Sequence, residues 1–463
     1  MSFVSLAFLI FYAIVFILYY ALPGMRTQNL LILVASYFFY GWWDWRFMPL
    51  LLGISLTNFI TAIVIERAEG GRTKKIFFLT SLAVSLGALA LFKYFDFFSQ
   101  SLAALARSMG FSADFPTLRL ILPLGISFMT FQGLAYVIDV WRGKQAAETD
   151  LVRFLAFKAF FPQLIAGPIE RANHLLTQFA HERSLDGDKV RQAIWLLVYG
   201  FTIKIVIADG LAPIVDSVFT ADQPFGWSVV LGTMAFGLQI YTDFNGYSLI
   251  AKGLALLLGF DLIWNFRFPY WAVSPRDFWQ RWHVSLSGWL RDYLYIPLGG
   301  NRYGRYKTIR NLYITMLLGG LWHGASWNFV GWGFLHGTAL ATSRLFDDAK
   351  PNRAQIVAGW ASTMIVVFVG WFFFRATSYS VLHGMLAALN NMEWAPVHGA
   401  IVRALFAAAL PLFAIEWVQQ RTGDDFVLMS ARPWATAPIL ACFCVSCLIM
   451  LRQYRATFIY FQF

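Results

Sequence analysis

The chain has 463 residues, of which 59% are hydrophobic and 13% are charged, and its mean hydropathy is +0.58. An ordinary globular domain is about half apolar and about a quarter charged, so this composition excludes a soluble enzyme and predicts an integral membrane protein. The net charge of +11 would suit nucleic acid, but the basic residues lie in short loops beside apolar runs, so we expect anionic lipid and a phosphate-bearing cofactor instead.

Apolar runs in the chain are long enough for many membrane spans. A span needs roughly 20 apolar residues. Such runs lie near 3–22, 29–43, 47–65, 76–98, 119–141, 193–215, 227–242, 246–264, 311–321, 326–346, 356–376, 401–420 and 436–452. Two or three are too short or too polar, so we predict an all-α, polytopic membrane protein with about ten or eleven transmembrane helices plus re-entrant or interfacial helices.

The chain shows no boundary between domains. Residues 1–22 lack the basic start of a signal peptide and are predicted to form the first span. No linker or fixed-period repeat follows, which predicts a single membrane-embedded domain over 1–463. A transporter would often show weak symmetry between its halves, and its absence argues against transport.

Two connecting loops are densely basic. They are "RAEGGRTKK" (67–75) and "NRYGRYKTIR" (301–310). Cytoplasmic loops carry an excess of Lys and Arg, so both loops are predicted to face the cytoplasm.

Ionisable residues at bilayer depth cost about 2.5–3.5 kcal/mol each, so each one needs a partner or a cavity. Asp139 lies near Arg142, and Lys204 lies near Asp209, and ion pairs within the protein explain both. "FPQLIAGPIER" (161–171) carries Glu170 directly after the helix-breaking Gly167-Pro168. Its residues either line a water-filled cavity or form an ordinary interfacial loop.

A polar stretch, "QIYTDFNGYSLIAKG" (239–253), lies between two apolar runs. It contains Asp243 and Asn245, and it suits either a hydrophilic funnel or hydrogen bonds between helices.

Residues 274–300 are predicted to form an amphipathic interfacial helix, which starts with Ser274 as the cap and Pro275 at the first position. Its aromatic stripe consists of Phe278, Trp282, Leu286, Trp289 and Tyr293.

Two histidines lie in the apolar run "GGLWHGASWNFVGWGFLHG" (319–337). If 322–340 is one helix, His336 lies about 220° around the axis from His323, so the two cannot pair. His283 is then the better companion for His323, while Gly319, Gly320 and Gly324 leave room for a substrate. A metal site is not predicted at the histidines, because no H-x-x-x-H or carboxylate cluster accompanies them.

The cysteines do not predict a metal site either. Cys442, Cys444 and Cys447 lie together in an apolar run, where a role in packing is favoured.

Several motifs together resemble the membrane-bound O-acyltransferase family, and within it the alginate O-acetyltransferase branch. They are "FKYFDFF" (92–98), "FPQLIAGPIER", "YTDFNGYS", "NFRFPY" (265–270), "WQRWHVSLSGWLRDYLYIPLGGNR" and "GLWHGASWNFVGWGFLHG". The resemblance implies a ring of helices around a thin waist that is reached by funnels from both membrane faces. It also implies that His323 is catalytic and that His283 has a second functional role.

The function that this resemblance implies is O-acetyl transfer in a bacterial inner membrane. Acetyl-CoA would be the cytoplasmic donor, and no cofactor would be bound permanently. The acceptor would be a periplasmic protein of a complex that acetylates an alginate-like or cellulose-like exopolysaccharide. His323 would act as general base, and His283 would orient the acyl group or donor, or steady developing charge. The apolar surroundings would exclude water from the thioester.

Further residues of the motifs are candidates for substrate or donor binding. They are Arg281, Trp282, Trp322, Asn328, Asp243 and Asn245, with Arg302 and Arg305 placed to meet CoA phosphates. Two alternatives remain open. One is teichoic-acid-type D-alanyl transfer from an acyl-carrier protein, and the other is a non-enzymatic membrane transporter.

Overall fold

The computed structural model of the chain describes all residues except 113, 165–166, 222–223, 345–351, 377, 431–432, 451–457 and 460–463. Within the described ranges every regular element is an α, 3-10 or π helix, and no strand is present. This confirms the predicted all-α class. Contacts divide the chain into two compact units, which are described in turn: Met1–Asp186 with Leu254–Ile263, and Gly187–Gly253 with Trp264–Phe463.

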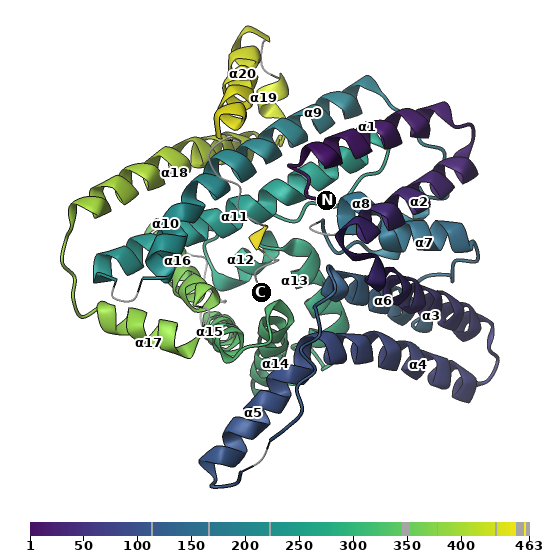
Figure 1. Ribbon diagram of the computed structural model, residues 1–463, viewed down its shortest axis with the longest axis horizontal. Helices are drawn as coiled ribbons and strands as arrows, with labels where there is room; N and C mark the ends of the chain where they lie inside the picture. The colour runs from purple at the N-terminus through teal and green to yellow at the C-terminus, as the bar shows by residue number, and fades with distance from the viewer. Residues whose placement is uncertain are drawn as a thin grey trace. The chain divides into compact units, whose positions relative to one another are not determined.

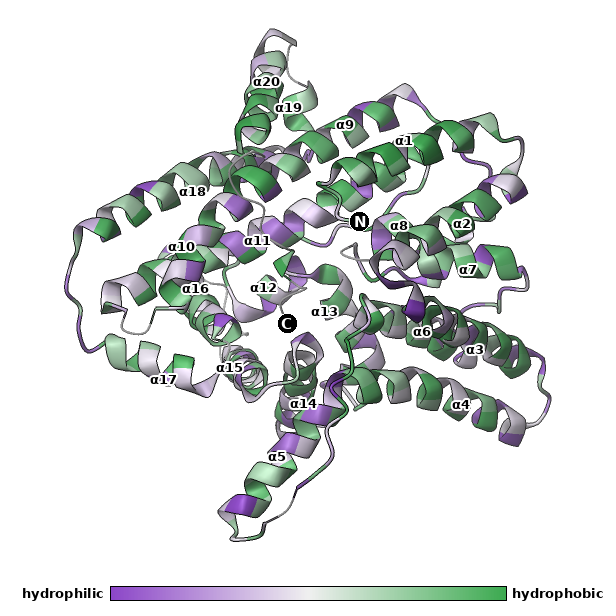
Figure 2. Ribbon diagram, viewed as in Figure 1, coloured by the Kyte–Doolittle hydropathy of each residue, from purple (hydrophilic) through white to green (hydrophobic). Residues whose placement is uncertain are grey.

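Five helical stretches among the described residues are long and apolar enough to cross a membrane. They are Met25–Arg67, Gly71–Ser108, Gly187–Phe219, Arg353–Arg375 and Pro396–Thr422, and three shorter apolar helices are Leu6–Ala21, Ile126–Trp141 and Thr436–Met450. Many large apolar side chains on such helices are exposed, among them Ile365 at 65% and Leu410 at 64%. Green, hydrophobic ribbon covers much of these helices in Figure 2. The protein is therefore a multi-pass membrane protein whose outer side chains face lipid.

The first unit holds the N-terminal helices (Figure 1). They are α1 (Leu6–Ala21), α2 (Met25–Asp44), η1 (Trp45–Phe47), α3 (Met48–Arg67), α4 (Gly71–Leu89), η2 (Ala90–Tyr94), α5 (Phe95–Ser108), α6 (Ile126–Trp141), α7 (Leu151–Ala159), α8 (Phe161–Leu164) and η3 (Ala172–Leu176). Ser5 caps α1, because its hydroxyl accepts a hydrogen bond from the Phe8 amide at 3.2 Å. A buried cluster from α2, α3, α6, α7 and α8 forms part of its core: Tyr40, Leu51, Ile54, Met129, Ala159 and Leu164.

The same unit is completed by a short segment from much later in the chain, Leu254–Ile263. Two tyrosines of α1 hold the start of this segment. The Tyr12 hydroxyl donates to the Leu254 carbonyl at 2.8 Å, and the Tyr20 hydroxyl donates to the Leu257 carbonyl at 2.7 Å. Helix α1 is thus bonded to backbone that lies 237 to 242 positions away in sequence.

The second unit holds the remaining helices, apart from residues 254–257 at the end of α11. They are α9 (Gly187–Thr202), η4 (Ile203–Ala208), α10 (Asp209–Phe219), α11 (Gly226–Leu257), η5 (Pro269–Trp271), α12 (Pro275–Arg281), α13 (Val284–Leu290), η6 (Arg291–Tyr295), α14 (Arg305–His323), α15 (Trp327–Ser343), α16 (Arg353–Arg375), α17 (Tyr379–Ala388), α18 (Pro396–Thr422), α19 (Val427–Ser430) and α20 (Pro433–Met450). The start of α16 is fixed by a capping box, in which Asn352 and Gln355 bond each other's backbone amides.

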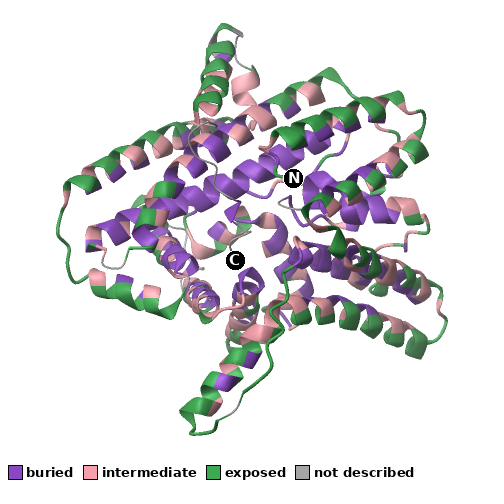
Figure 3. Ribbon diagram, viewed as in Figure 1, coloured by how far each residue is buried: buried purple, intermediate pink, exposed green. Residues whose placement is uncertain are grey.

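Helix α11 differs from its prediction. Residues 227–242 and 246–264 were expected to form two runs, but Gly226–Leu257 is one continuous helix. Figure 3 shows most of this helix as buried, and every residue of 239–253 is buried. The polar stretch is therefore enclosed by protein, where its side chains need partners from other helices.

Helices α14 and α15 form an antiparallel hairpin whose backbones approach closely at glycines. A Cβ atom on Gly320 would lie 2.1 Å from the Phe329 carbonyl oxygen, and one on Gly333 would lie 2.3 Å from that of Met316. Only glycine fits at such distances, so these glycines set the spacing of the hairpin.

The cysteines of α20 differ from their prediction as packing residues. Cys442 and Cys444 are exposed, and Cys447 is only partly buried. Its sulfur lies 3.7 Å from the Thr202 hydroxyl oxygen. Packing against the protein is therefore found for Cys447 alone.

Candidate active site

His323 is the last residue of α14, and the helix predicted over 322–340 is interrupted directly after it. The next helix, α15, begins at Trp327. Gly324 lies against the Phe329 ring, where a Cβ atom would come within 2.1 Å of a ring carbon. Gly324 itself is extended, with φ of −161° and ψ of 148°, and this ends α14, so the assumption of one helix over 322–340 is wrong.

Aromatic rings surround the His323 imidazole, which is only 4% exposed as a residue. Its ring centroid lies 5.1 Å from that of Trp322, 5.0 Å from that of Trp332 and 5.3 Å from that of Phe374. All three contacts are edge-to-face, the geometry that aromatic rings prefer. The imidazole therefore lies in an apolar enclosure that keeps bulk water away.

His283 lies at a second helix break, between α12 and α13. The single helix predicted over 274–300 is divided into α12 and α13, because Trp282 is extended and His283 has a left-handed backbone with φ of 43°. The cap at Ser274 is as predicted, since its hydroxyl accepts from the Asp277 amide at 3.1 Å.

The break follows from backbone pairing with residues 265–267. The Val284 amide donates to the Asn265 carbonyl at 2.9 Å, and the Arg267 amide donates to the Arg281 carbonyl at 2.9 Å. These bonds replace two hydrogen bonds of a continuous helix.

The aromatic stripe is buried within the unit, which corrects the expectation that it faces the membrane interface. Its members are at most 8% exposed: Phe278, Trp282, Leu286, Trp289 and Tyr293.

The two histidines meet at one indole ring. The His283 ring centroid lies 5.9 Å from that of Trp322, and the His323 centroid lies 5.1 Å from it. His283 is fully buried, and its Nδ1 lies 3.1 Å from the Asn265 side-chain oxygen. His283 lies between α12 and α13, and each of these helices has seven residues, too few to cross a membrane. Burial lowers the pKa of His283 to about 3, so its imidazole is neutral at physiological pH.

His336 lies closer to His323 than its predicted helical phase allows. Its ring centroid is 4.7 Å from that of Trp332, the same indole that contacts His323 at 5.0 Å. The phase argument fails because the two histidines belong to different helices. His336 also contacts Trp279 at 5.1 Å, so it forms part of the aromatic packing behind the site.

The predicted aromatic and amide residues are distributed around this centre. Trp322, a candidate for substrate or donor binding, lies within it and contacts both histidines. Trp282 is buried and packs on Trp371 with 4.7 Å between centroids. Asn328 instead donates to the Ala376 carbonyl at 2.6 Å and links α15 to the end of α16.

Asp243 belongs to a buried charge cluster. Lys204 Nζ lies 2.5 Å from Asp209 Oδ1 and 2.7 Å from Asp243 Oδ1, which confirms the predicted Lys204–Asp209 pair. The other Asp243 oxygen accepts from the Ile459 amide at 2.7 Å. These bonds give Asp243 a structural role, whereas its neighbour Asn245 lines a cavity of about 30 Å³ with Tyr241 and Glu416.

The predicted arginines lie in two different settings. Arg281 bonds Asp277 at 2.6 Å and lines an open cavity with Arg267 and Asp425. Arg302 is exposed in the loop before α14, and Arg305 is exposed as the first residue of that helix.

A larger cavity of about 540 Å³ was not foreseen from the sequence. It is lined by residues of α12, α13, α14 and α15 and includes three arginines, Arg276, Arg291 and Arg344. Its described lining contains no Asp or Glu, although Arg291 bonds the neighbouring Asp292 at 2.7 Å. Trp279 also lines it, and the Trp279 ring contacts Trp332 at 5.6 Å. The cavity therefore lies one indole ring away from the rings around His323.

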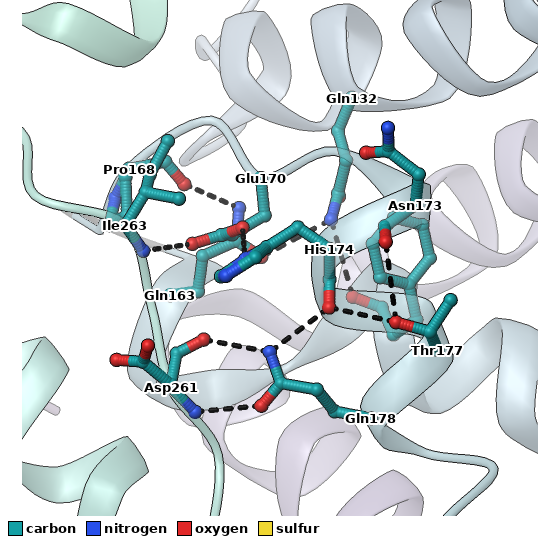
Figure 4. A network of polar contacts seen from close by, with 11 residues as sticks. Gln132, Gln163, Pro168, Glu170, Asn173, His174, Thr177, Gln178, Asp261 and Ile263 are labelled. Carbon is teal, nitrogen blue, oxygen red and sulfur yellow. Dashed lines mark hydrogen bonds and ion pairs between the residues drawn. The ribbon is translucent and has the colours of Figure 1, made fainter.

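The "GPIER" motif lies in the first unit, and Figure 4 shows its polar contacts. Glu170 is fully buried; one carboxylate oxygen lies 2.8 Å from His174 Nδ1, and the other accepts from the Ile263 amide at 2.7 Å. Gln163 donates to the Pro168 carbonyl at 2.9 Å. The segment is buried and bonded, unlike an ordinary interfacial loop; residues 165 and 166 of the motif lie outside the described residues.

Comparisons with known proteins cover this region. The profile of MBOAT, the membrane-bound O-acyltransferase family, matches residues 145–386. A probable alginate O-acetylase of Pseudomonas putida is 40% identical over 489 aligned residues, covering 100% of both chains. Another, from Pseudomonas aeruginosa, is 42% identical over 84% of this chain and 75% of its own. A peptidoglycan O-acetyltransferase of Helicobacter pylori is 33% identical over 79% of this chain and 75% of its own.

Proposed function

Because the chain belongs to the membrane-bound O-acyltransferase family and is an O-acyltransferase, we propose that it transfers acetyl groups from acetyl-CoA for O-acetylation of an exopolysaccharide. The donor reaches the site from the cytoplasm, and the acceptor lies in the periplasm, so the enzyme acts in the bacterial inner membrane. The relatives named for alginate O-acetylation support an alginate-like polymer.

The observation that carries this proposal is the enclosure of His323. A buried imidazole among Trp322, Trp332 and Phe374 provides a proton acceptor at a place from which water is excluded. A thioester survives there until an acceptor hydroxyl arrives, since hydrolysis needs water.

The proposed step is a direct acyl transfer. The acceptor oxygen attacks the thioester carbonyl carbon while His323 removes the hydroxyl proton as general base, a role that typically contributes about 10²–10⁴-fold. The new C–O ester bond forms, the C–S bond breaks, and the coenzyme A sulfur takes the proton from His323. His283, across Trp322, contacts the reacting groups from the other side of the site.

The arginine-lined cavity is the proposed site of the donor. Coenzyme A carries phosphates that Arg276, Arg291 and Arg344 would bind through charge-assisted hydrogen bonds. Trp279 offers an aromatic wall toward His323. Arg302 and Arg305, exposed just before and at the start of α14, remain a second proposed phosphate contact.

A periplasmic protein is the proposed acetyl acceptor. It would carry the acetyl group from the membrane site to the polymer, because a buried histidine is not accessible to a long polysaccharide chain. The partner belongs to a polysaccharide acetylation complex, and the serine hydroxyl of such a protein has the chemistry that the step requires.

The test uses purified protein in proteoliposomes with labelled acetyl-CoA and a periplasmic acceptor protein. His323→Ala is expected to lower acetyl transfer by about 100-fold or more, because the general base is lost. His383→Ala is the matched control, since His383 is exposed on α17 and its loss should leave the rate unchanged.

Two outcomes would contradict the proposal. Transfer by His323→Ala at a rate close to that of the parent protein would remove His323 from the mechanism. Activity with a D-alanyl-loaded carrier protein and none with acetyl-CoA would replace acetyl transfer by D-alanyl transfer.

A further inference from the structure

The orientation of the Asn265 side chain is fixed by its neighbours. Its Oδ1 lies 3.4 Å from the Ser285 backbone nitrogen, a group that can only donate. The Ser285 hydroxyl also donates to Oδ1 at 2.9 Å. On the other side, Asn265 Nδ2 donates to the Ser248 hydroxyl at 3.4 Å. The oxygen of the amide therefore faces His283, and the nitrogen faces away.

This orientation determines which His283 nitrogen carries the proton. Asn265 Oδ1 lies 3.1 Å from His283 Nδ1, and an amide oxygen can only accept. Nδ1 must then be the donor. In a neutral imidazole one nitrogen donates and the other accepts, so Nε2 carries a lone pair.

The surrounding structure leaves the ring little freedom to change. The Val284 amide bonds the Asn265 carbonyl at 2.9 Å, which ties the two segments together beside the histidine. The Phe244 ring stands edge-on to the imidazole with 4.7 Å between centroids, and Trp322 contacts it at 5.9 Å. A flipped ring would place Cδ2 where Nδ1 lies, and the hydrogen bond to the Asn265 oxygen would be lost.

We infer that Asn265 is a positioning residue that holds His283 in the tautomer with a proton on Nδ1, so that His283 Nε2 accepts a hydrogen bond from an N–H or O–H group of the substrate. This inference rests on the proposed acyl transfer, and it narrows the role of His283 within it. A neutral Nε2 without a proton cannot donate to the developing oxyanion. His283 therefore orients the donor amide or the acceptor hydroxyl, and it does not stabilise negative charge.

The first test observes the tautomer directly and needs no acetyl transfer. Protein labelled with ¹⁵N-histidine is reconstituted in lipid, and the His283 signals are assigned by their loss in His283→Gln. The parent protein should show a protonated Nδ1 and an unprotonated Nε2. A protonated Nε2 would overturn the inference even if acetyl transfer by the parent protein were confirmed.

The second test separates positioning from folding. Asn265→Leu removes the acceptor and should lower kcat about tenfold or more with little change in KM, the pattern of an interaction needed in the transition state. Asn265→Asp keeps an acceptor facing Nδ1 and should restore both the tautomer signal and most of kcat. Ser248→Ala is the matched control, because the Ser248 hydroxyl accepts from the Asn265 amide nitrogen, on the side away from His283.

Two results with these variants would contradict the inference about Asn265. If Asn265→Asp is folded, keeps the Nδ1 proton and is as slow as Asn265→Leu, the tautomer is not what Asn265 contributes. If Asn265→Leu retains the parent kcat, Asn265 has no positioning role. Loss of activity in His323→Ala, measured in parallel, keeps both results distinct from a failure of the proposed acyl transfer.

Discussion

At the scale of single residues, the centre of the site depends on Trp322. Its indole contacts His283 at 5.9 Å and His323 at 5.1 Å, so one side chain joins the two imidazoles. Both histidines come from motifs in which they could be identified. Asn265 also lies in such a motif, but nothing in "NFRFPY" indicates that its amide faces a histidine, because that contact depends on the break at Trp282–His283.

The arginines give a residue-scale prediction about the donor. Arg276→Gln and Arg344→Gln should each raise the KM for acetyl-CoA about threefold to tenfold and leave kcat nearly unchanged, because exposed contacts to the donor phosphates act equally in the ground and transition states. Acetyl-pantetheine lacks the nucleotide phosphates, so its KM should not change. Initial rates with both donors provide the measurement.

The two proposed phosphate contacts are distinguished by the same assay. Arg302→Gln and Arg305→Gln change exposed residues at the start of α14 and just before it, outside the cavity lining. If only these loop variants raise the KM for acetyl-CoA, the phosphates bind at the loop and the cavity assignment is wrong.

At the scale of helices, the α14–α15 hairpin positions His323. Gly320→Ala or Gly333→Ala would push a methyl group into backbone at 2.1 or 2.3 Å, so each should lower the stability of the folded protein by about 1–3 kcal/mol and reduce acetyl transfer. Gly331→Ala is the matched control in the same helix. Its added Cβ would meet the Phe373 ring at 3.6 Å, an ordinary contact, so stability should be unchanged or slightly higher.

Thermal unfolding in detergent, followed beside specific activity, checks this prediction. Equal melting temperatures for Gly320→Ala and Gly331→Ala would show that the hairpin has room for a methyl group. It would also weaken the view that close backbone contact sets the position of His323.

The same scale shows where sequence patterns are insufficient. Apolar runs predicted the helical class, because burial in lipid demands helices whatever the tertiary contacts. The breaks at 282–283 and 324–326 depend on tertiary contacts instead: backbone bonds from residues 265–267 replace helical bonds, and the Phe329 ring lies against Gly324. For the same reason the merging of two predicted runs into α11 was missed. The polar residues between the runs have partners that are distant in sequence, such as Lys204 for Asp243.

At the scale of the whole molecule, the family membership agrees with the motifs from which the resemblance was drawn. The sidedness of the loops stays a prediction. Tyr306 is 90% exposed and lies in the first turn of α14, within the basic segment 301–310 that should face the cytoplasm. In a background where Cys442, Cys444 and Cys447 are replaced by Ser, Tyr306→Cys should resist a membrane-impermeant thiol reagent added to intact cells, and it should react after the cells are lysed.

Labelling of intact cells would reverse this orientation. The cytoplasmic donor would then lose its support from the charge pattern. A cysteine at Gly71, the first residue of α4 in the other basic segment, tests the same side of the membrane independently.

The return of residues 254–263 to the first unit has a consequence for biosynthesis. The α1 tyrosines and Glu170 bond the Leu254 and Leu257 carbonyls and the Ile263 amide, all of which leave the ribosome after residues 187–253 of the other unit. At about 5–20 residues per second, the nascent first unit waits several seconds for the backbone groups that its two tyrosines and Glu170 bond. The helices of the first unit are thus made first, but the unit is completed only after residues 187–253 of the other unit have been made. A nascent chain that stalls near residue 186 therefore holds an incomplete unit, which membrane quality control can recognise.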